Sequence, residues 1–101
     1  MFDKLGAAKQ MAEGVKTKLE SITVVGEAAN GGVKVISNGN RKIQEVQIKD
    51  ELLHPEKKEE LEAYLIVAIN RALESAENVS ESEMRSMMST MMPTLGGLFG
   101  K

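Results

Sequence analysis

Cysteine and tryptophan are absent from the 101 residues, and there is one histidine. Without thiols the chain has no disulfide, no cysteine nucleophile and no thiolate metal ligand, which fits a reducing cytosol. The histidine, His54, precedes Pro55 and has no second histidine or cysteine with which to share a metal, so we expect a loop residue. No serine lies in a nucleophile motif, and no acidic cluster has calcium-loop spacing. The sequence therefore predicts no enzyme, no catalytic residue, no metal and no cofactor.

Aromatic residues make up only 3% of the chain, so its core must be aliphatic and methionine-rich. No stretch approaches the roughly 18 apolar residues of a membrane span, and the N-terminus lacks the apolar region of a signal peptide. We therefore expect one cytoplasmic domain that has no membrane partner. A chain of this length buries about 60–65% of its unfolded surface, enough for a modest core.

Charge is distributed unevenly along the chain. The net charge of −2 argues against a strongly basic nucleic-acid binder. Residues 1–49 nevertheless hold eight Lys and Arg against five Asp and Glu, whereas residues 50–101 hold five against ten. Such an asymmetry is compatible with one basic face and equally with ordinary solvated surface.

Residues 3–22 are predicted to form the first helix. Its apolar positions repeat at alternating spacings of three and four, which favours lengthwise packing against another helix. These positions are Leu5, Ala8, Ala12, Val15, Leu19 and Ile22. Lys9, Lys16 and Lys18 lie mainly off this stripe, where they either keep the helix soluble or meet phosphates.

Three strands are expected next, at 23–28, 33–37 and 43–48. Two turn signals, Asn30-Gly31-Gly32 and Asn38-Gly39-Asn40, separate them and predict an antiparallel meander. The apolar alternation of the third strand slips, which places a bulge near Gln44-Glu45. One face of this sheet is apolar and two edges are open, and open edges invite pairing with another chain.

A second helix is predicted from Glu59, and its segment 63–69 is apolar on every side. One small sheet and one helix cover only part of such a helix, so we expect a second copy of the chain to cover the rest. Asn70 is either solvent-facing or a buried polar group that sets pairing register. The candidate core and dimer residues are Leu61, Leu65, Ile66, Ile69, Asn70 and Leu73.

A methionine face follows on the same helix or on a restarted one. Met84, Met87, Met88, Met91 and Met92 fall at helical spacing, and methionine packs adaptably. The face either packs within the protein or binds a protein partner through Met84, Met87, Met88 and Met91. We expect Pro93 to end the helix, so that one domain spans 1–92 and a mobile glycine-rich tail spans 93–101.

Residues 5–92 resemble the YbaB/EbfC family of nucleoid-associated proteins. The resemblance is carried by Val24-Val25-Gly26-Glu27-Ala28, Gly31-Gly32-Val33-Lys34-Val35, Asn38-Gly39-Asn40-Arg41-Lys42-Ile43 with Val46-Gln47-Ile48, and Leu61 to Ala72. It implies an α+β, α-β-β-β-α homodimer shaped like tweezers that binds double-stranded DNA in the bacterial nucleoid. The family has no fixed DNA-contact signature.

The sequence thus predicts a DNA-binding homodimer that contacts phosphates and reads few bases. The candidate DNA-binding residues are the basic side chains of the N-terminal half, Lys9, Lys16, Lys18, Arg41 and Lys42. The alternative is a protein-interaction adaptor that uses the methionine face.

Overall fold

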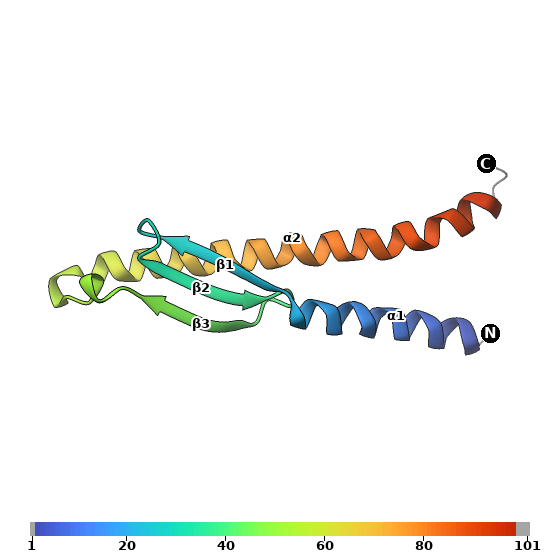
Figure 1. Ribbon diagram of the computed structural model, residues 1–101, viewed down its shortest axis with the longest axis horizontal. Coiled ribbons are helices and arrows are strands. Elements are labelled where there is room, and N and C mark those ends of the chain that lie inside the picture. The colour runs from blue at the N-terminus through green and yellow to red at the C-terminus, as the bar shows by residue number, and fades with distance from the viewer. Residues whose placement is uncertain (1, 99–101) are drawn as a thin grey trace.

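The computed structural model describes the backbone of residues 2–98 and the side chains of residues 9–90. The elements are helix α1 (Phe2–Ser21), strands β1 (Thr23–Ala28), β2 (Val33–Asn38) and β3 (Ile43–Ile48), short 3-10 helices η1 (Asp50–Leu52) and η2 (Pro55–Lys57), and helix α2 (Lys58–Leu98). This order confirms the predicted α-β-β-β-α arrangement of an α+β protein. The molecule is elongated, with extents of 66 × 27 × 16 Å (Figure 1).

The three strands form one antiparallel sheet in the order β1-β2-β3. Ile36 pairs with Glu45 and the next residue, Ser37, pairs with Ile43, so Gln44 has no partner on β2. This irregularity confirms the bulge expected near Gln44-Glu45. The turn between β1 and β2 passes through left-handed backbone at Ala29, Asn30 and Gly31, as the Asn-Gly-Gly signal predicts.

The core lies between the sheet and the first half of α2, which crosses β1 and β2. Ala68, Ala72 and Ala76 are fully buried on the face of α2 that meets the sheet, as are Val33 and Val35 of β2. Alanine side chains allow the helix to approach the strands closely. The larger side chains Leu61, Tyr64, Leu65 and Ile69 pack around this centre and are partly buried.

Both helices continue beyond the sheet toward the same end of the molecule and form two arms (Figure 1). Among the side chains of residues 9–90, the expected lengthwise packing of α1 on α2 is closest at the base of the arms. Leu19 is buried and Val15 is half-buried, but Ala12 is exposed, and Gly14 has no neighbour within 4 Å of its side-chain position. Alanine and glycine offer too little side-chain area to hold the outer parts together. The side chains of Leu5 and Ala8 lie outside the described residues.

Helix α2 runs unbroken for 41 residues. The expectation that Pro93 ends it is wrong, because the helix extends to Leu98. A proline inside a helix removes one hydrogen bond and bends the axis, and neither effect forbids helical backbone on its C-terminal side. The expected mobile tail falls partly on residues 99–101, which lie outside the described part of the chain. Across residues 2–98, neither helix has the length and apolar character needed to cross a membrane.

Candidate nucleic-acid interface

The turn between β2 and β3 carries Arg41 and Lys42 and is shaped by a buried asparagine. Asn38 is 5% exposed, and its Oδ1 accepts hydrogen bonds from the backbone N–H of Asn40 (2.9 Å) and of Lys42 (3.1 Å). The N–H of Arg41 donates to the carbonyl of Asn38 at 3.1 Å, and Arg41 itself has left-handed backbone, with a φ of 63°. Asn38 thus fixes the path of the turn that presents the two cations.

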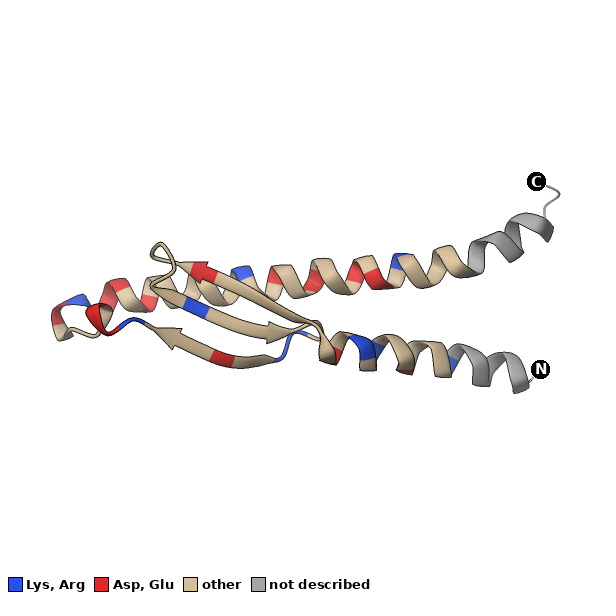
Figure 2. Cartoon of the chain, viewed as in Figure 1, with Lys and Arg blue, Asp and Glu red and all other residues tan. Residues whose placement is uncertain are grey.

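The same turn is joined to the base of α1. The side-chain amide of Asn40 donates a hydrogen bond to the carbonyl of Lys16 at 3.0 Å. The N–H of Gly39 donates to the carbonyl of Leu19 at 2.8 Å, and a Cβ at Gly39 would lie within 3 Å of that oxygen. These contacts bring Lys16 to the turn that carries Arg41 and Lys42, although the two segments are 24 residues apart (Figure 2).

Lys9 extends this group of cations along α1. It precedes Lys16 by seven residues, so it lies on nearly the same side of the helix about 10.5 Å further out. The side chains of Lys9, Lys16, Arg41 and Lys42 form what we call the cationic surface. All four side chains are exposed. Glu13 and Glu20 lie at spacings of three and four from Lys9 and Lys16 on this side of α1, so the excess of positive charge comes from Arg41 and Lys42 of the turn.

Lys18, the fifth candidate, does not belong to this surface. Its Nζ lies 3.0 Å from Oε2 of Glu83 on α2, so it points toward the opposite arm. The pair borders an open groove of about 250 Å³ at the base of the arms, with Met11, Gly14, Val15 and Met87 in its lining. The structure therefore places Lys16 beside the turn that carries Arg41 and Lys42, with Lys9 two turns further along α1, and it directs Lys18 toward α2.

The arm formed by α2 has the opposite charge from the cationic surface. Between residues 74 and 85 it holds four glutamates and one arginine, and Figure 2 shows these acidic positions along the middle of the helix. They are Glu74, Glu77, Glu81, Glu83 and Arg85. A polyanion approaching the molecule is therefore repelled from this part of α2.

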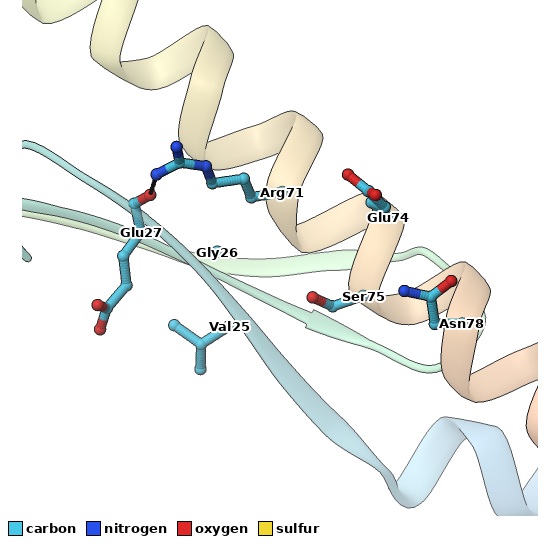
Figure 3. Close-up of a pocket in the computed structure, with 7 residues that line it drawn as sticks. All are labelled: Val25, Gly26, Glu27, Arg71, Glu74, Ser75 and Asn78. Atoms are coloured by element: carbon cyan, nitrogen blue, oxygen red, sulfur yellow. Dashed lines mark hydrogen bonds between the residues drawn. The ribbon is translucent and has the colours of Figure 1, made fainter.

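A polar pocket of about 500 Å³ lies between α2 and the outer edge of β1 (Figure 3). Arg71 spans it and donates from Nη1 to the carbonyl of Glu27 at 2.7 Å, while the side chains of Val25 and Glu27 point away from α2. The guanidinium thereby occupies a backbone acceptor that a pairing strand would need. Among the side chains that the structure describes, no group of three or more His, Asp or Glu residues is placed to hold a metal ion.

The candidate core and dimer residues divide into two groups. Leu61, Leu65 and Ile69 are partly buried against the core, and Leu73 is half-buried. Ile66 is 61% exposed and Asn70 is also exposed. Asn70 is thus solvent-facing in a single chain, and its role in pairing stays a prediction.

Sequence reasoning missed the residues that organise the site. Asn38 and Asn40 were recognised only as a turn signal, although their side chains form the hydrogen bonds that position the cations. No sequence pattern predicts the contacts that Glu83 and Arg71 make. The Asn-Gly-Asn motif was the one available signal, since asparagine side chains commonly hydrogen-bond to nearby backbone.

The chain has the element order, the two arms and the exposed cations of a small, two-armed DNA-binding protein. The chain belongs to the YbaB/EbfC DNA-binding family, whose family model matches residues 1–91. This is a family of DNA-binding proteins and not of enzymes, and its curated relatives are named for the nucleoid.

Relatives from several bacteria support the assignment. The chain is 35% identical to a nucleoid-associated protein of Flavobacterium johnsoniae over 98 residues, covering 97% of this chain and 91% of that one. It is 34% identical to a nucleoid-associated protein of Pelotomaculum thermopropionicum, covering 84% and 79%. The crystal structure of an uncharacterized protein from Helicobacter pylori has a TM-score of 0.69 and 26% identity, covering 82% of this chain and 96% of that one.

Proposed function

We propose that this protein is a homodimer in the bacterial cytoplasm that binds double-stranded DNA of the nucleoid mainly through phosphate contacts. The cationic surface of Lys9, Lys16, Arg41 and Lys42 would face the DNA backbone. The observation that supports the proposal is the hydrogen bond from Asn40 to the carbonyl of Lys16, because it holds α1 beside the turn that carries Arg41 and Lys42.

Phosphate contact fits the chemistry of this surface better than base readout. Its cations lie on long, exposed side chains, and phosphate oxygens accept hydrogen bonds from such groups whatever the sequence. Two-fold symmetry doubles the number of cations that one duplex meets, which offsets the net charge of −2.

A salt titration of DNA binding tests this mechanism. Each neutralised phosphate contributes about −0.9 to the slope of log K against log salt on duplex DNA. Four cations per subunit predict a slope of about −3.6 for one subunit and about −7 for a dimer that uses both surfaces. Duplexes of different sequence should bind within a few-fold of one another. A flat salt response would rule out the electrostatic mechanism.

The homodimer is supported by apolar side chains that one chain leaves uncovered. Directly paired residues of an antiparallel sheet point to the same face. Val46 pairs with the fully buried Val35, so it points to the face that α2 covers over β1 and β2. Over β3 this face is open: Val46 is 45% exposed and Ile43 is 38% exposed. We propose that a second copy covers these residues together with Ile66 of α2.

The two edges of the sheet differ, and the difference favours β3 over β1 as the place where a second copy packs. Arg71 occupies the carbonyl of Glu27 on the outer edge of β1. At β3, by contrast, the exposed residues Ile43 and Val46 lie beside an edge that no other strand of the chain covers. Covering a fully exposed Val or Ile contributes about 1.5–3 kcal/mol, so each of these half-exposed side chains contributes about half of that when a second copy covers it. Light scattering of the protein at micromolar concentration should give twice the chain mass.

A second candidate function, a protein-interaction adaptor, is favoured by the methionine face. Met84 and Met88 are 44% and 57% exposed, and Met87 lies in the groove between the arms. The side chains of Met91 and Met92 lie outside the described residues. If the protein is an adaptor, the double variant Met84→Ser, Met88→Ser should lose a bound client helix and keep its DNA affinity. Loss of DNA affinity in that variant would count against this function.

A further inference from the structure

One ion pair joins the two arms of the molecule. Lys18 Nζ lies 3.0 Å from Glu83 Oε2, although the residues are 65 positions apart in the chain. Among the described side chains, the other ion pairs lie within the sheet, Lys34 with Glu27, or within α2, Arg85 with Glu81, both at 3.8 Å. The Lys18–Glu83 pair is thus the shortest of these and the one that connects different helices.

The two partners differ in their access to solvent. The side chain of Glu83 is 19% exposed and that of Lys18 is 62% exposed. Apolar groups of the groove, Met11, Val15 and Met87, lie around the pair. The carboxylate is therefore held in place beside the groove, while the ammonium can reach a ligand in solvent without unfolding either helix.

We propose that Glu83 is an internal competitor of DNA phosphate for Lys18. This inference rests on the proposed function, because it requires that α1 faces the DNA backbone. A carboxylate and a phosphate oxygen both accept charge-assisted hydrogen bonds from one ammonium group. In the absence of DNA, Glu83 holds Lys18; when DNA binds, Lys18 must exchange this carboxylate for a phosphate. Lys18 therefore adds little to DNA affinity while Glu83 is present. Glu83 thereby lowers the affinity of the protein for DNA.

The primary test is the Glu83→Gln variant, which keeps the shape of the side chain and removes its charge. Because exposed pairs are worth up to about 1 kcal/mol, we expect DNA affinity at low salt to rise about two- to fivefold. The salt slope should become more negative by about 0.9 for each Lys18 released. Glu77→Gln is the matched control: Glu77 is exposed on the same helix and pairs with no cation among the described side chains. Equal gains in the two variants would show only a general charge effect and would overturn the proposal.

A double-mutant cycle separates competition from bulk charge. Lys18→Gln should weaken DNA binding less than twofold in the native chain and about two- to fivefold in the Glu83→Gln background. Equal losses in both backgrounds would refute the inference. Thermal unfolding checks that each variant folds. If Glu83→Gln does not fold, single lysine variants of the otherwise native chain provide the test. Lys18→Gln should then weaken DNA binding less than Lys16→Gln does. Equal weakening would overturn the proposal.

Failure of this inference can be told apart from failure of the proposed function. If the native protein shows no salt-dependent DNA binding, phosphate contact itself is wrong. If it binds with a steep salt slope and Lys16→Gln weakens binding, but Lys18 and Glu83 act additively, only the role of Glu83 is wrong.

Discussion

Gly26 of β1 packs directly against the backbone of Ala72 of α2. A Cβ atom at position 26 would overlap the backbone N of Ala72 and the carbonyl oxygen of Ala68. The sheet and the helix therefore meet backbone to backbone at this point, which is the closest approach that two elements can make. The position of α2 over β1 depends on the absence of a side chain here.

The first prediction concerns this contact. Gly26→Ala forces α2 away from β1 and should lower the free energy of unfolding by about 1–3 kcal/mol or more, as overpacking does. Gly14→Ala is the matched control, because nothing lies within 4 Å of its side-chain position and alanine is the better helix former. It should raise stability by up to about 1 kcal/mol. Urea unfolding at one fixed protein concentration measures both, and equal stabilities would contradict the packing described here.

The second prediction concerns the contact between the β2–β3 turn and α1. Asn40→Ala removes the hydrogen bond to Lys16, so Arg41 and Lys42 are held less firmly beside α1. Stability should fall by only about 0.5–1.5 kcal/mol, whereas DNA affinity should fall several-fold. Asn78→Ala, at an exposed position of α2 outside the candidate dimer residues, is the control and should leave DNA affinity unchanged. Fluorescence anisotropy with a labelled duplex measures the difference.

The third prediction concerns the number of phosphates contacted. Arg41→Gln with Lys42→Gln should make the salt slope less negative by about 1.8 per subunit. Lys57→Gln with Lys58→Gln removes the same charge at the start of α2, at the opposite end of the sheet from the arms, and should change the slope much less (Figure 1). Slopes that change equally in both variants would show that net charge, and not this surface, governs binding.

The fourth prediction concerns self-association. Val46→Glu introduces a charge on the sheet face where we propose that the second copy packs, and it should convert the dimer to a single chain. Val25→Glu is a closely matched control, because Val25 is also 45% exposed but points to the opposite sheet face, away from α2. Light scattering distinguishes the two outcomes. A Val46→Glu protein that remains dimeric would place the interface elsewhere.

Much of the fold could be predicted because its signals are local. Turn residues such as Asn30-Gly31 and the slipped alternation after Ile43 mark strand ends and the bulge within a few positions. The contact between α1 and α2 could not be read in the same way. Its heptad pattern describes which side of α1 is apolar, but Ala12 and Gly14 are too small to hold the outer arm against its neighbour. Pro93 is also a misleading signal, because a proline can bend a helix without ending it, and α2 continues to Leu98.

The candidate site was predictable in its residue types but not in its arrangement. Exposed lysines and arginines of the N-terminal half were recognised from charge alone. The approach of the turn to α1 depends on hydrogen bonds from Gly39 and Asn40 to carbonyls about 20 positions away in the chain, and nothing local in the sequence signals them. Lys18 follows Lys16 by two positions, which places it about 200° around the helix, where it meets Glu83 of α2.

Because α1 and α2 leave the sheet in the same direction, Phe2 and Leu98 both lie near the tips of the arms (Figure 1). A fluorescent protein or affinity tag fused to either terminus would hang at the end where the arms project and would crowd an approaching duplex. The loop around Leu53 and His54, at the far end of the molecule, is exposed and joins two short 3-10 helices. Probes for imaging or immobilisation belong in that loop, where they leave the arms unhindered.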